Sequence, residues 1–345
     1  MAPLRPEGAD AVPSEAAAPP GAVRPVEPSG TPDTDRAPLY AALDLGTNSC
    51  RMLIARPEGA QFHVIDSFSK TVQLGTGLEA SGRLSRASMG RTVQALRICQ
   101  KKLESHGVRR MRLVATEACR RARNARDFIR AVRRETGLSL EIIPPQEEAR
   151  LAVVSCAPLV EAGTEQLLVV DIGGGSTELV WIDLSAVPPE ARGRALWRFD
   201  PGFAVAGAGS KPRVVDWISV PLGVATLREQ FGDVEDDGAR FALMSWYFEE
   251  QLHRFSPYQD GAPPAAGFQI IGTSGTITTV AASWLGLRRY DRAKVDGLVM
   301  TSGQIDAVIR DYLSLGPEGR RTDPRIGRDR HMLIMSGAAI LQTLM

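Results

Sequence analysis

The stretch LLVVDIGGGSTELVWI, residues 167–182, constrains the fold more than any other part of the sequence. Two apolar runs typical of buried strands flank a turn of three glycines, and an aspartate stands at the end of the first run. Glycines let the backbone come close to a ligand, and the N–H groups of such a turn can face an anion. The stretch therefore predicts a strand hairpin that holds an anion beside a carboxylate able to bind a cation.

Two further stretches share this design. Residues 43–55, LDLGTNSCRMLIA, again place an aspartate and a glycine turn between two strands. Residues 270–282, IIGTSGTITTVAA, follow a strand with glycine, hydroxyls and a helix start, where the positive end of the helix favours anions. Any one of these stretches is also compatible with an ordinary turn that needs a glycine. Three of them together predict a phosphate site divided between distant parts of the chain.

The order of the expected elements indicates two α/β domains. A three-stranded meander is followed by helix, strand, helix and strand, and the pattern restarts at Leu167. A chain of 345 residues is long enough for two domains. We expect them at residues 38–160 and 161–345. Residues 185–212, rich in Gly, Pro and Arg, are interpreted as a surface loop inserted between strands of the second domain.

Composition excludes several classes of protein. Residues 1–37 consist mainly of Pro, Ala, Gly and acids without any aromatic residue, which predicts a disordered tail. The net charge of +1 provides no excess of positive field for nucleic acid. No apolar run approaches the roughly 20 residues that cross a bilayer. We therefore expect a cytoplasmic protein without a nucleic-acid or membrane partner.

Three other stretches narrow the interpretation: ATEACRRARNARDF at residues 115–128, IIPPQEEARLAVVSC at 142–156 and ISVPLGVATLREQFG at 218–232. With the glycine turns, they resemble the actin-like (ASKHA) superfamily, and within it the exopolyphosphatase and guanosine pentaphosphate phosphohydrolase (Ppx/GppA) family. The resemblance implies two tandem actin-like, ribonuclease H-like α/β domains with a phosphate-binding cleft between them. Members of the family are commonly homodimers.

The resemblance also implies roles for individual residues. Glu148, the second glutamate of the QEEAR stretch, matches the catalytic residue of the family, and Arg120 matches a phosphate-binding arginine. Asn124, one helical turn beyond Arg120, is expected to support that site. Asp171 and Glu178, with Asp44, are expected to hold Mg²⁺. The remaining expected substrate-binding residues are Gly46, Thr47, Asn48, Ser49, Arg51, Gly173, Gly174, Gly175, Ser176, Thr177, Gly272, Ser274 and Gly275.

The function implied is Mg²⁺-dependent hydrolysis of a terminal phosphoanhydride bond, with release of orthophosphate from inorganic polyphosphate, guanosine pentaphosphate or both. Two alternatives stay open: an ATP-dependent sugar kinase of the same fold, and an inactive protein that binds polyphosphate or the guanosine alarmone. The chain departs from the family in having Pro144-Pro145 where a flexible pair such as Ser-Gly is usual. Family members usually continue with a further strand and a glycine-rich segment, whereas this sequence stops at Met345. We therefore expect the short two-domain type with a shortened second domain.

Overall fold

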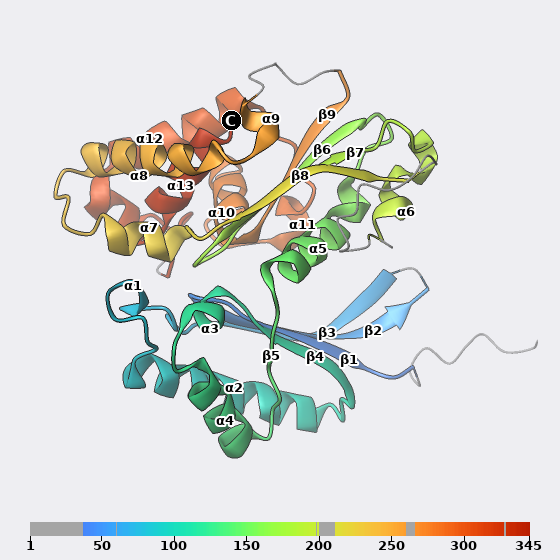
Figure 1. The fold of residues 1–345 in the computed structure, drawn as a ribbon, viewed down its shortest axis with the longest axis vertical. Coiled ribbons are helices and arrows are strands. Elements are labelled where there is room, and N and C mark those ends of the chain that lie inside the picture. The colour runs from blue at the N-terminus through green and yellow to red at the C-terminus, as the bar shows by residue number, and fades with distance from the viewer. Residues whose placement is uncertain (1–36, 60, 198, 200–210, 260–265, 328) are drawn as a thin grey trace, which may run out of the picture. The chain divides into compact units, whose positions relative to one another are not determined.

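The computed structural model describes residues 37–345 apart from residues 60, 198, 200–210, 260–265 and 328. Within it, Pro38–Met345 form one compact unit, shown in Figure 1. The tail expected at residues 1–37 lies, except for Ala37, outside the described residues. Separate hydrophobic clusters divide the compact unit into a first lobe, residues 38–143, and a second lobe, residues 144–345.

A five-stranded mixed sheet forms the first lobe, in the order β3-β2-β1-β4-β5. The first three strands are the antiparallel meander expected from the sequence, and β4 and β5 run parallel to β1. Alternate residues of β1 are buried, including Leu43 and Leu45. Since side chains alternate along a strand, Asp44 lies on the opposite face of the sheet. The strands are β1 (Tyr40–Leu45), β2 (Ser49–Glu58), β3 (Gln61–Thr71), β4 (Arg110–Ala115) and β5 (Glu141–Ile142).

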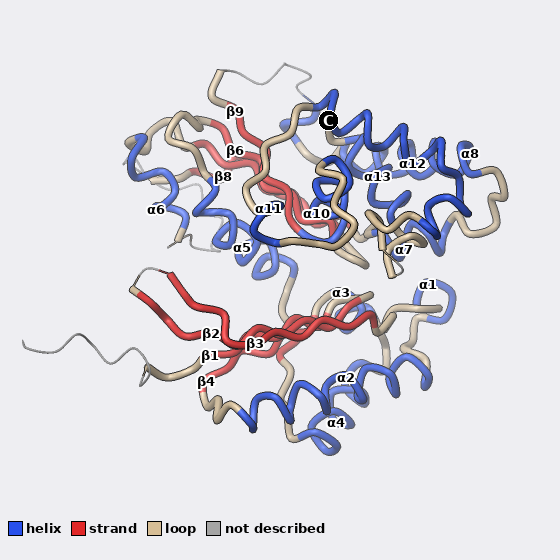
Figure 2. The backbone as a smooth tube through the Cα atoms, turned by 180° about the vertical axis from the view of Figure 1, so that it is seen from behind, coloured by secondary structure: helices blue, strands red, loops and turns tan. Residues whose placement is uncertain are grey.

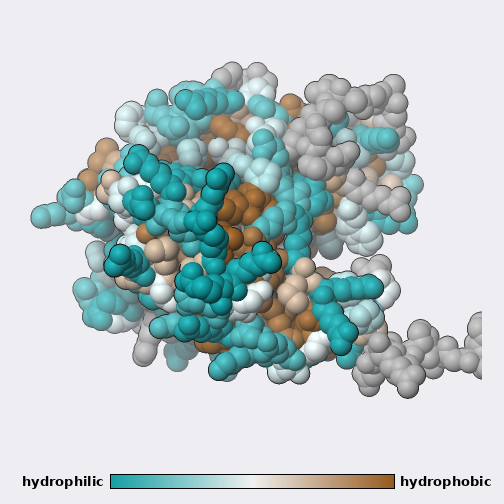
Figure 3. Space-filling model, turned by 60° about the horizontal axis from the view of Figure 1, so that its bottom comes forward, coloured by the Kyte–Doolittle hydropathy of each residue, from teal (hydrophilic) through white to brown (hydrophobic). Residues whose placement is uncertain are grey.

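α2 (Arg86–Ser105) and α4 (Ala125–Thr136) cover one face of this sheet and leave the face with Asp44 toward the second lobe (Figures 1 and 2). The longest helix begins at a cap in which the Ser85 hydroxyl accepts a hydrogen bond from the Ser88 N–H. Figure 3, with the bottom of Figure 1 turned forward, shows hydrophilic residues over most of the outer face. The helices are α1 (Leu78–Ser81), α2 (Arg86–Ser105), α3 (Glu117–Arg121) and α4 (Ala125–Thr136).

The second lobe contains a four-stranded mixed sheet in the order β8-β7-β6-β9, with β9 parallel to β6. Both faces of β6 are covered, so its apolar run is continuous. Leu167 and Val169 pack in the cluster that contains α5, whereas Leu168 and Val170 pack in the cluster of the C-terminal helices. Asp171 follows the first pair and therefore lies on the α5 side. The strands are β6 (Gln166–Ile172), β7 (Thr177–Asp183), β8 (Arg213–Val220) and β9 (Phe268–Thr273).

The helices of the second lobe surround this sheet. Those described are α5 (Pro145–Cys156), η2 (Ala157–Leu159), η3 (Pro189–Ala191), α6 (Arg192–Leu196), α7 (Val224–Gln230), α8 (Asp237–Leu252), α9 (Ser256–Gln259), α10 (Ser274–Trp284), α11 (Arg292–Val295), α12 (Ser302–Thr322) and α13 (Ile334–Thr343). None of these helices, nor those of the first lobe, is long and apolar enough to cross a membrane within the described residues.

Part of the expected surface loop at residues 185–212 is ordered and packed. Residues 189–196 form η3 and α6, and Leu196 is fully buried in the cluster that includes α5. The apolar residues of this segment stand among glycines, prolines and arginines, so its composition did not indicate a packed helix. The interpretation of the whole segment as a surface loop is therefore wrong for η3 and α6, while residues 198 and 200–210 lie outside the described residues.

Candidate active site

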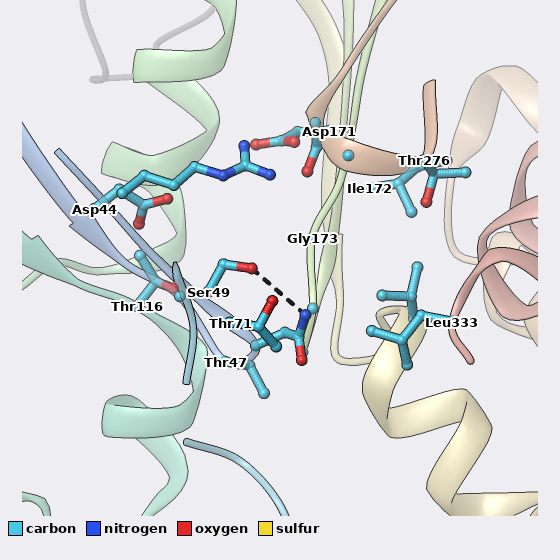
Figure 4. A pocket seen from close by; sticks show the side chains of 18 of the residues that line it. Asp44, Thr47, Ser49, Thr71, Thr116, Asp171, Ile172, Gly173, Thr276 and Leu333 are labelled. Atoms are coloured by element: carbon cyan, nitrogen blue, oxygen red, sulfur yellow. Dashed lines mark hydrogen bonds between the residues drawn. The ribbon is translucent and has the colours of Figure 1, made fainter. Parts of the chain in front are cut away.

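Two strand-turn-strand hairpins, one from each lobe, face a common cavity of about 230 Å³. β1 turns into β2 through residues 46–49, and β6 turns into β7 through residues 173–176. The start of α10 and the turn before α13 complete the lining. Figure 4 shows Asp44 and Asp171 in the same space, with Thr47, Ser49 and Thr71 near Gly173.

The turn of the first hairpin is held by the segment that follows β3. The N–H groups of Val72 and Gln73 both donate to the Asn48 carbonyl at 2.9 Å, and the Gly75 N–H donates to the Thr47 carbonyl at 3.0 Å. The carbonyls of the turn are thereby occupied. Among the described residues, the N–H groups of Thr47 and Asn48 donate to no backbone carbonyl. The turn can therefore present two N–H donors to an anion.

The turn of the second hairpin is held in the same way by the start of α7. The Val224 N–H donates to the Gly173 carbonyl at 3.0 Å and the Ala225 N–H to the Gly174 carbonyl at 2.8 Å. Within the described part of the chain, the N–H groups of Gly174 and Gly175 have no backbone acceptor. Both hairpins therefore have their carbonyls engaged and a pair of N–H donors left for a ligand.

The two turns touch each other. A Cβ added to Gly174 would lie 3.0 Å from the backbone nitrogen of Asn48. One added to Gly175 would collide with the Thr47 hydroxyl. That hydroxyl is buried and makes no hydrogen bond with any described residue. The missing side chains of the two glycines let the lobes close, and the unpaired Thr47 hydroxyl is available to a ligand.

Four carboxylates gather beside the cavity, and all four hold their protons more tightly than usual. Desolvation in the cavity, with the charge of Asp171 added, raises the pKa of Asp44 to about 6, although Asp44 keeps surface open to the cavity. Burial also raises the pKa of Glu148 to about 7, and Asp171 and Asp44 add to the effect. The pKa of Glu178 is raised well above its ordinary value by burial and then by Glu148 and Asp171. Burial raises the pKa of Asp171 itself. Such a group of acids favours binding of a cation.

Glu178 and Asp171 are the pair that best fits a metal ion. They lie directly opposite each other in the register of β6 and β7. Glu178 is 1% exposed; its Oε1 accepts a 2.8 Å hydrogen bond from Ser219, while its Oε2 has no partner among the described residues. Those residues contain no group of three or more side chains arranged as metal ligands. Mg²⁺ at phosphate sites commonly uses one or two carboxylates, with phosphate oxygens and water completing the shell, and this pair fits that smaller set.

Arg120 binds two glutamates and does not line the cavity. Its Nη1 donates to Glu148 Oε2 at 2.7 Å and to the Ile143 carbonyl at 3.0 Å. Its Nε donates to Glu117 Oε2 at 2.9 Å. Burial works to lower the pKa of Arg120, but the charges of Glu148 and Glu117 raise it overall. Arg120 thus contacts Glu148 directly and lies outside the lining of the cavity.

Three cationic side chains line the cavity: Arg51, Lys70 and Arg330. Arg51 reaches from the first lobe to the start of α10, where a Cβ on Gly275 would lie 3.4 Å from its Nη2. Arg330 donates to the Thr279 hydroxyl. Burial, and then the charge of Arg51, lower the pKa of Arg330. Arginines that repel each other across a cavity favour an anion between them.

The third glycine loop reaches the cavity through a strained residue. Ser274, the first residue of α10, has a φ of 81°, in the left-handed region that residues other than glycine rarely adopt. Ser274 and Gly275 both line the cavity. Strained backbone is concentrated at functional sites, and here it places the start of a helix at the anion site.

Most of the expected site residues meet in this cavity, but five do not. Thr177 is fully buried and donates to the Leu222 carbonyl at 2.8 Å. Gly272 lies within β9 against the Ile277 side chain. Asn124 bonds the backbone of Leu84 instead of supporting Arg120. Arg120 and Glu178 lie behind the lining as described above. The expected residues that line the cavity are Asp44, Gly46, Thr47, Asn48, Ser49, Arg51, Glu148, Asp171, Gly173, Gly174, Gly175, Ser176, Ser274 and Gly275.

The sequence argument missed several lining residues. Lys70 is the next-to-last residue of β3, Glu117 begins α3 one residue after β4, and Arg330 belongs to the turn before α13. Glu117 stands within the stretch at residues 115–128 that carries the family resemblance, which was the available signal. No sequence signal indicated Lys70, because β3 is not followed by a glycine turn of the kind found after β1 and β6.

Comparison with known proteins agrees with this geometry. Residues 53–345 match the Ppx/GppA phosphatase family. The guanosine-5'-triphosphate,3'-diphosphate pyrophosphatase of Aeromonas salmonicida is 30% identical over 308 residues, which are 88% of this chain and 54% of that protein. The chain thus spans about half the length of the curated relatives it matches.

Solved structures extend the comparison to the fold. The Ppx/GppA family member of Aquifex aeolicus is 30% identical, with a TM-score of 0.65 over 89% of each chain. An exopolyphosphatase-like protein is 26% identical, with a TM-score of 0.72 over 89% of this chain and 88% of the other. The expected fold class, α/β with two actin-like halves, is confirmed.

Proposed function

Since the chain belongs to the Ppx/GppA phosphatase family, we propose that it hydrolyses the terminal phosphoanhydride bond of inorganic polyphosphate or guanosine pentaphosphate and releases orthophosphate. The observation that carries the proposal is the single cavity in which anion donors of both lobes meet Glu148. The names of the relatives, a guanosine-5'-triphosphate,3'-diphosphate pyrophosphatase and an exopolyphosphatase-like protein, support the same chemistry.

Phosphoryl transfer depends mainly on positioning and on neutralisation of charge. The free N–H groups of the two turns, with Arg51 and Arg330, bind oxygens of the terminal phosphates. Glu148 holds a water molecule in line with the terminal phosphorus. As the bond from water oxygen to phosphorus forms and the bridging phosphorus–oxygen bond breaks, Glu148 accepts the proton and the shortened phosphate chain leaves as an anion. Its pKa of about 7 suits a base at neutral pH.

Magnesium belongs to the proposal as the cation that Asp171 and Glu178, with Asp44 nearby, would hold. When bound, it would neutralise charge on the phosphate oxygens. The orphaned Oε2 of Glu178 and the mutual repulsion of the acids support this assignment.

The test replaces Glu148 by glutamine, which keeps an oxygen that can accept from Arg120. Glu148→Gln is expected to lower phosphate release by about 10²- to 10⁴-fold, the range that a general base contributes, with little change in polyphosphate affinity. Phosphate release is measured by a colorimetric assay and affinity by calorimetry. The matched control is Glu147→Gln, because the neighbouring Glu147 pairs with Arg112 and Arg150 and does not line the cavity. An equal loss of affinity in Glu148→Gln would contradict the role of a base.

Parallel assays decide between the substrates and the alternatives. The wild-type protein with Mg²⁺ is offered polyphosphates of defined length, guanosine pentaphosphate, and ATP with a sugar acceptor. Release of orthophosphate from either of the first two supports the proposal. Transfer from ATP to the sugar would identify a kinase, and tight binding without any release would identify an inactive binding protein.

A further inference from the structure

Glu117 is a buried acid at the cavity whose role the proposed mechanism leaves open. It is the first residue of α3, separated from β4 by Thr116 alone, and it is 8% exposed. It lines the cavity together with Glu148. Arg120 follows one helical turn later on the same face of α3, so that the backbone itself brings the two side chains together.

Arg120 links the two glutamates. Glu117 Oε2 lies 2.9 Å from Nε and 2.8 Å from Nη2 of Arg120, and Glu148 Oε2 lies 2.7 Å from Nη1. The Arg120 side chain is 12% exposed, and those of Glu117 and Glu148 are 10% and 18% exposed. With Glu117 on one side of the guanidinium and Glu148 on the other, the position of Arg120 depends on both. Without Glu117, Arg120 would lose the contacts of its Nε and its Nη2 with that carboxylate.

Glu117 also touches the opposite lobe. A Cβ added to Gly175, in the turn of the second hairpin, would lie 3.0 Å from Cγ of Glu117. The same added atom would collide with the Thr47 hydroxyl of the first hairpin. The Gly175 backbone is therefore packed against Glu117 when the two turns are together. The Gly175 backbone thus occupies the space beside Cγ of Glu117, on the side of the second hairpin.

We propose that Glu117 is a positioning residue, through which closure of the two turns fixes Arg120 and, through Arg120, the catalytic carboxylate of Glu148. The inference rests on the proposed hydrolysis. It assigns Glu117 an effect on the rate of the chemical step and none on the strength of substrate binding.

The test compares Glu117→Ala and Glu117→Gln by steady-state kinetics of phosphate release. Glu117→Ala is expected to lower kcat about 10- to 100-fold, since small displacements of a catalytic group have effects of this order, while KM changes less than about threefold. Glu117→Gln keeps an oxygen that accepts from Arg120 and should recover most of the lost kcat. Glu147→Ala is the control and should leave both constants unchanged.

Three results would overturn the inference: unchanged kcat in Glu117→Ala, a change confined to KM, or a Gln variant as impaired as the Ala variant. Thermal melting of each variant shows whether it is folded, and the glutamine variant, of the same shape as wild type, keeps the test valid if the alanine variant does not fold. Failure of the proposed function is a different result, because it would leave the wild-type protein itself without phosphate release.

Discussion

The two hairpins that face the cavity have similar backbones and different charge. In each, an aspartate closes the first strand, a four-residue turn follows, and a V-x-L-G segment, at residues 72–75 or 220–223, packs against the turn. Across the paired strands, Asp44 lies opposite Arg51, whereas Asp171 lies opposite Glu178. One hairpin therefore carries a balanced pair and the other carries two acids.

This difference in charge indicates that the two hairpins bind different parts of the ligand, although their backbones are similar. An arginine with donors to spare beside free N–H groups binds phosphate oxygens. Two buried carboxylates side by side require a cation or a proton. The repeated backbone supplies N–H donors twice, and one pair of side chains in each copy decides whether that copy attracts anions or cations.

The strongest test of this difference in charge replaces one residue in each hairpin by alanine. Glu178→Ala is expected to lower kcat about 10²- to 10³-fold, the size of effect seen when one electrostatic stabiliser is removed, and to raise the Mg²⁺ concentration needed for half activity. Arg51→Ala is expected to raise KM by about 10-fold or more, as for a lost bidentate phosphate contact. Kinetics over a series of Mg²⁺ concentrations separates the two. The same altered parameter in both variants would show that the hairpins do not divide the work.

The second test concerns the packing that the hairpins share. A Cβ on Gly223 would lie 2.5 to 2.6 Å from backbone atoms of Gly173, Gly174 and Gly175, which cannot move aside singly. Gly223→Ala should therefore lower the free energy of unfolding by about 3 kcal/mol, as severe overpacking does. A Cβ on Gly75 meets the side chain of Thr47, which can rotate, and Gly75→Ala should be less damaging.

Urea unfolding measures both variants, with Gly90→Ala as the control. Gly90 lies inside α2 with open space around it, so alanine should stabilise the protein by roughly 0.5 to 1 kcal/mol. Equal destabilisation by Gly75→Ala and Gly223→Ala would mean that the two turns are packed equally tightly.

The third test uses pH in the absence of divalent cations. The pKa of Glu178 is higher in the folded protein than in the unfolded chain, where it is about 4.5. Its contribution to the free energy of unfolding is therefore complete below pH 4.5 and is lost as pH rises through the folded-state pKa. Asp44 and Glu148 act in the same direction, up to about pH 6 and 7. Glu178→Gln removes a buried carboxylate whose Oε2 has no partner among the described residues, and it should be about 1 to 3 kcal/mol more stable than wild type at a pH above the raised pKa.

Thermal unfolding in EDTA at pH 4 and pH 8 compares the two proteins. At pH 4 the advantage of Glu178→Gln should vanish, since Glu178 is then neutral. Added Mg²⁺ at pH 8 should stabilise the wild type more than the variant. A variant less stable than wild type at pH 8 in EDTA would contradict the picture of uncompensated charge.

The smallest expected effect is that of salt. Raising the ionic strength screens the attraction between the cavity's arginines and a polyanion, so KM for polyphosphate should rise severalfold between about 0.05 and 0.2 M. The dependence should be weaker in Arg51→Ala and unchanged in Glu178→Ala. A salt-independent KM would show that the cationic hairpin does not attract the substrate electrostatically.

Sequence reasoning found what local pattern encodes and missed what depends on three-dimensional contact. The glycine turns and their aspartates were predicted because each follows a strand in a recognisable order, whereas Glu148 was predicted from the family resemblance. The orientation of Arg120 was not, because the face that a short helix such as α3 presents depends on Glu117 and on the opposite lobe. Arg330 and Lys70 come from segments whose own sequence has no phosphate-loop pattern.

The free N–H groups of the two turns can be followed by hydrogen–deuterium exchange, without an activity assay. Thr47, Asn48, Gly174 and Gly175 stand in well-packed turns, yet among the described residues their amides lack backbone acceptors. In the empty protein their hydrogens should exchange with deuterated solvent faster than those of the flanking strands. A bound phosphate chain would accept hydrogen bonds from them and slow the exchange, so that deuterium uptake at four positions reports which hairpin a given ligand occupies.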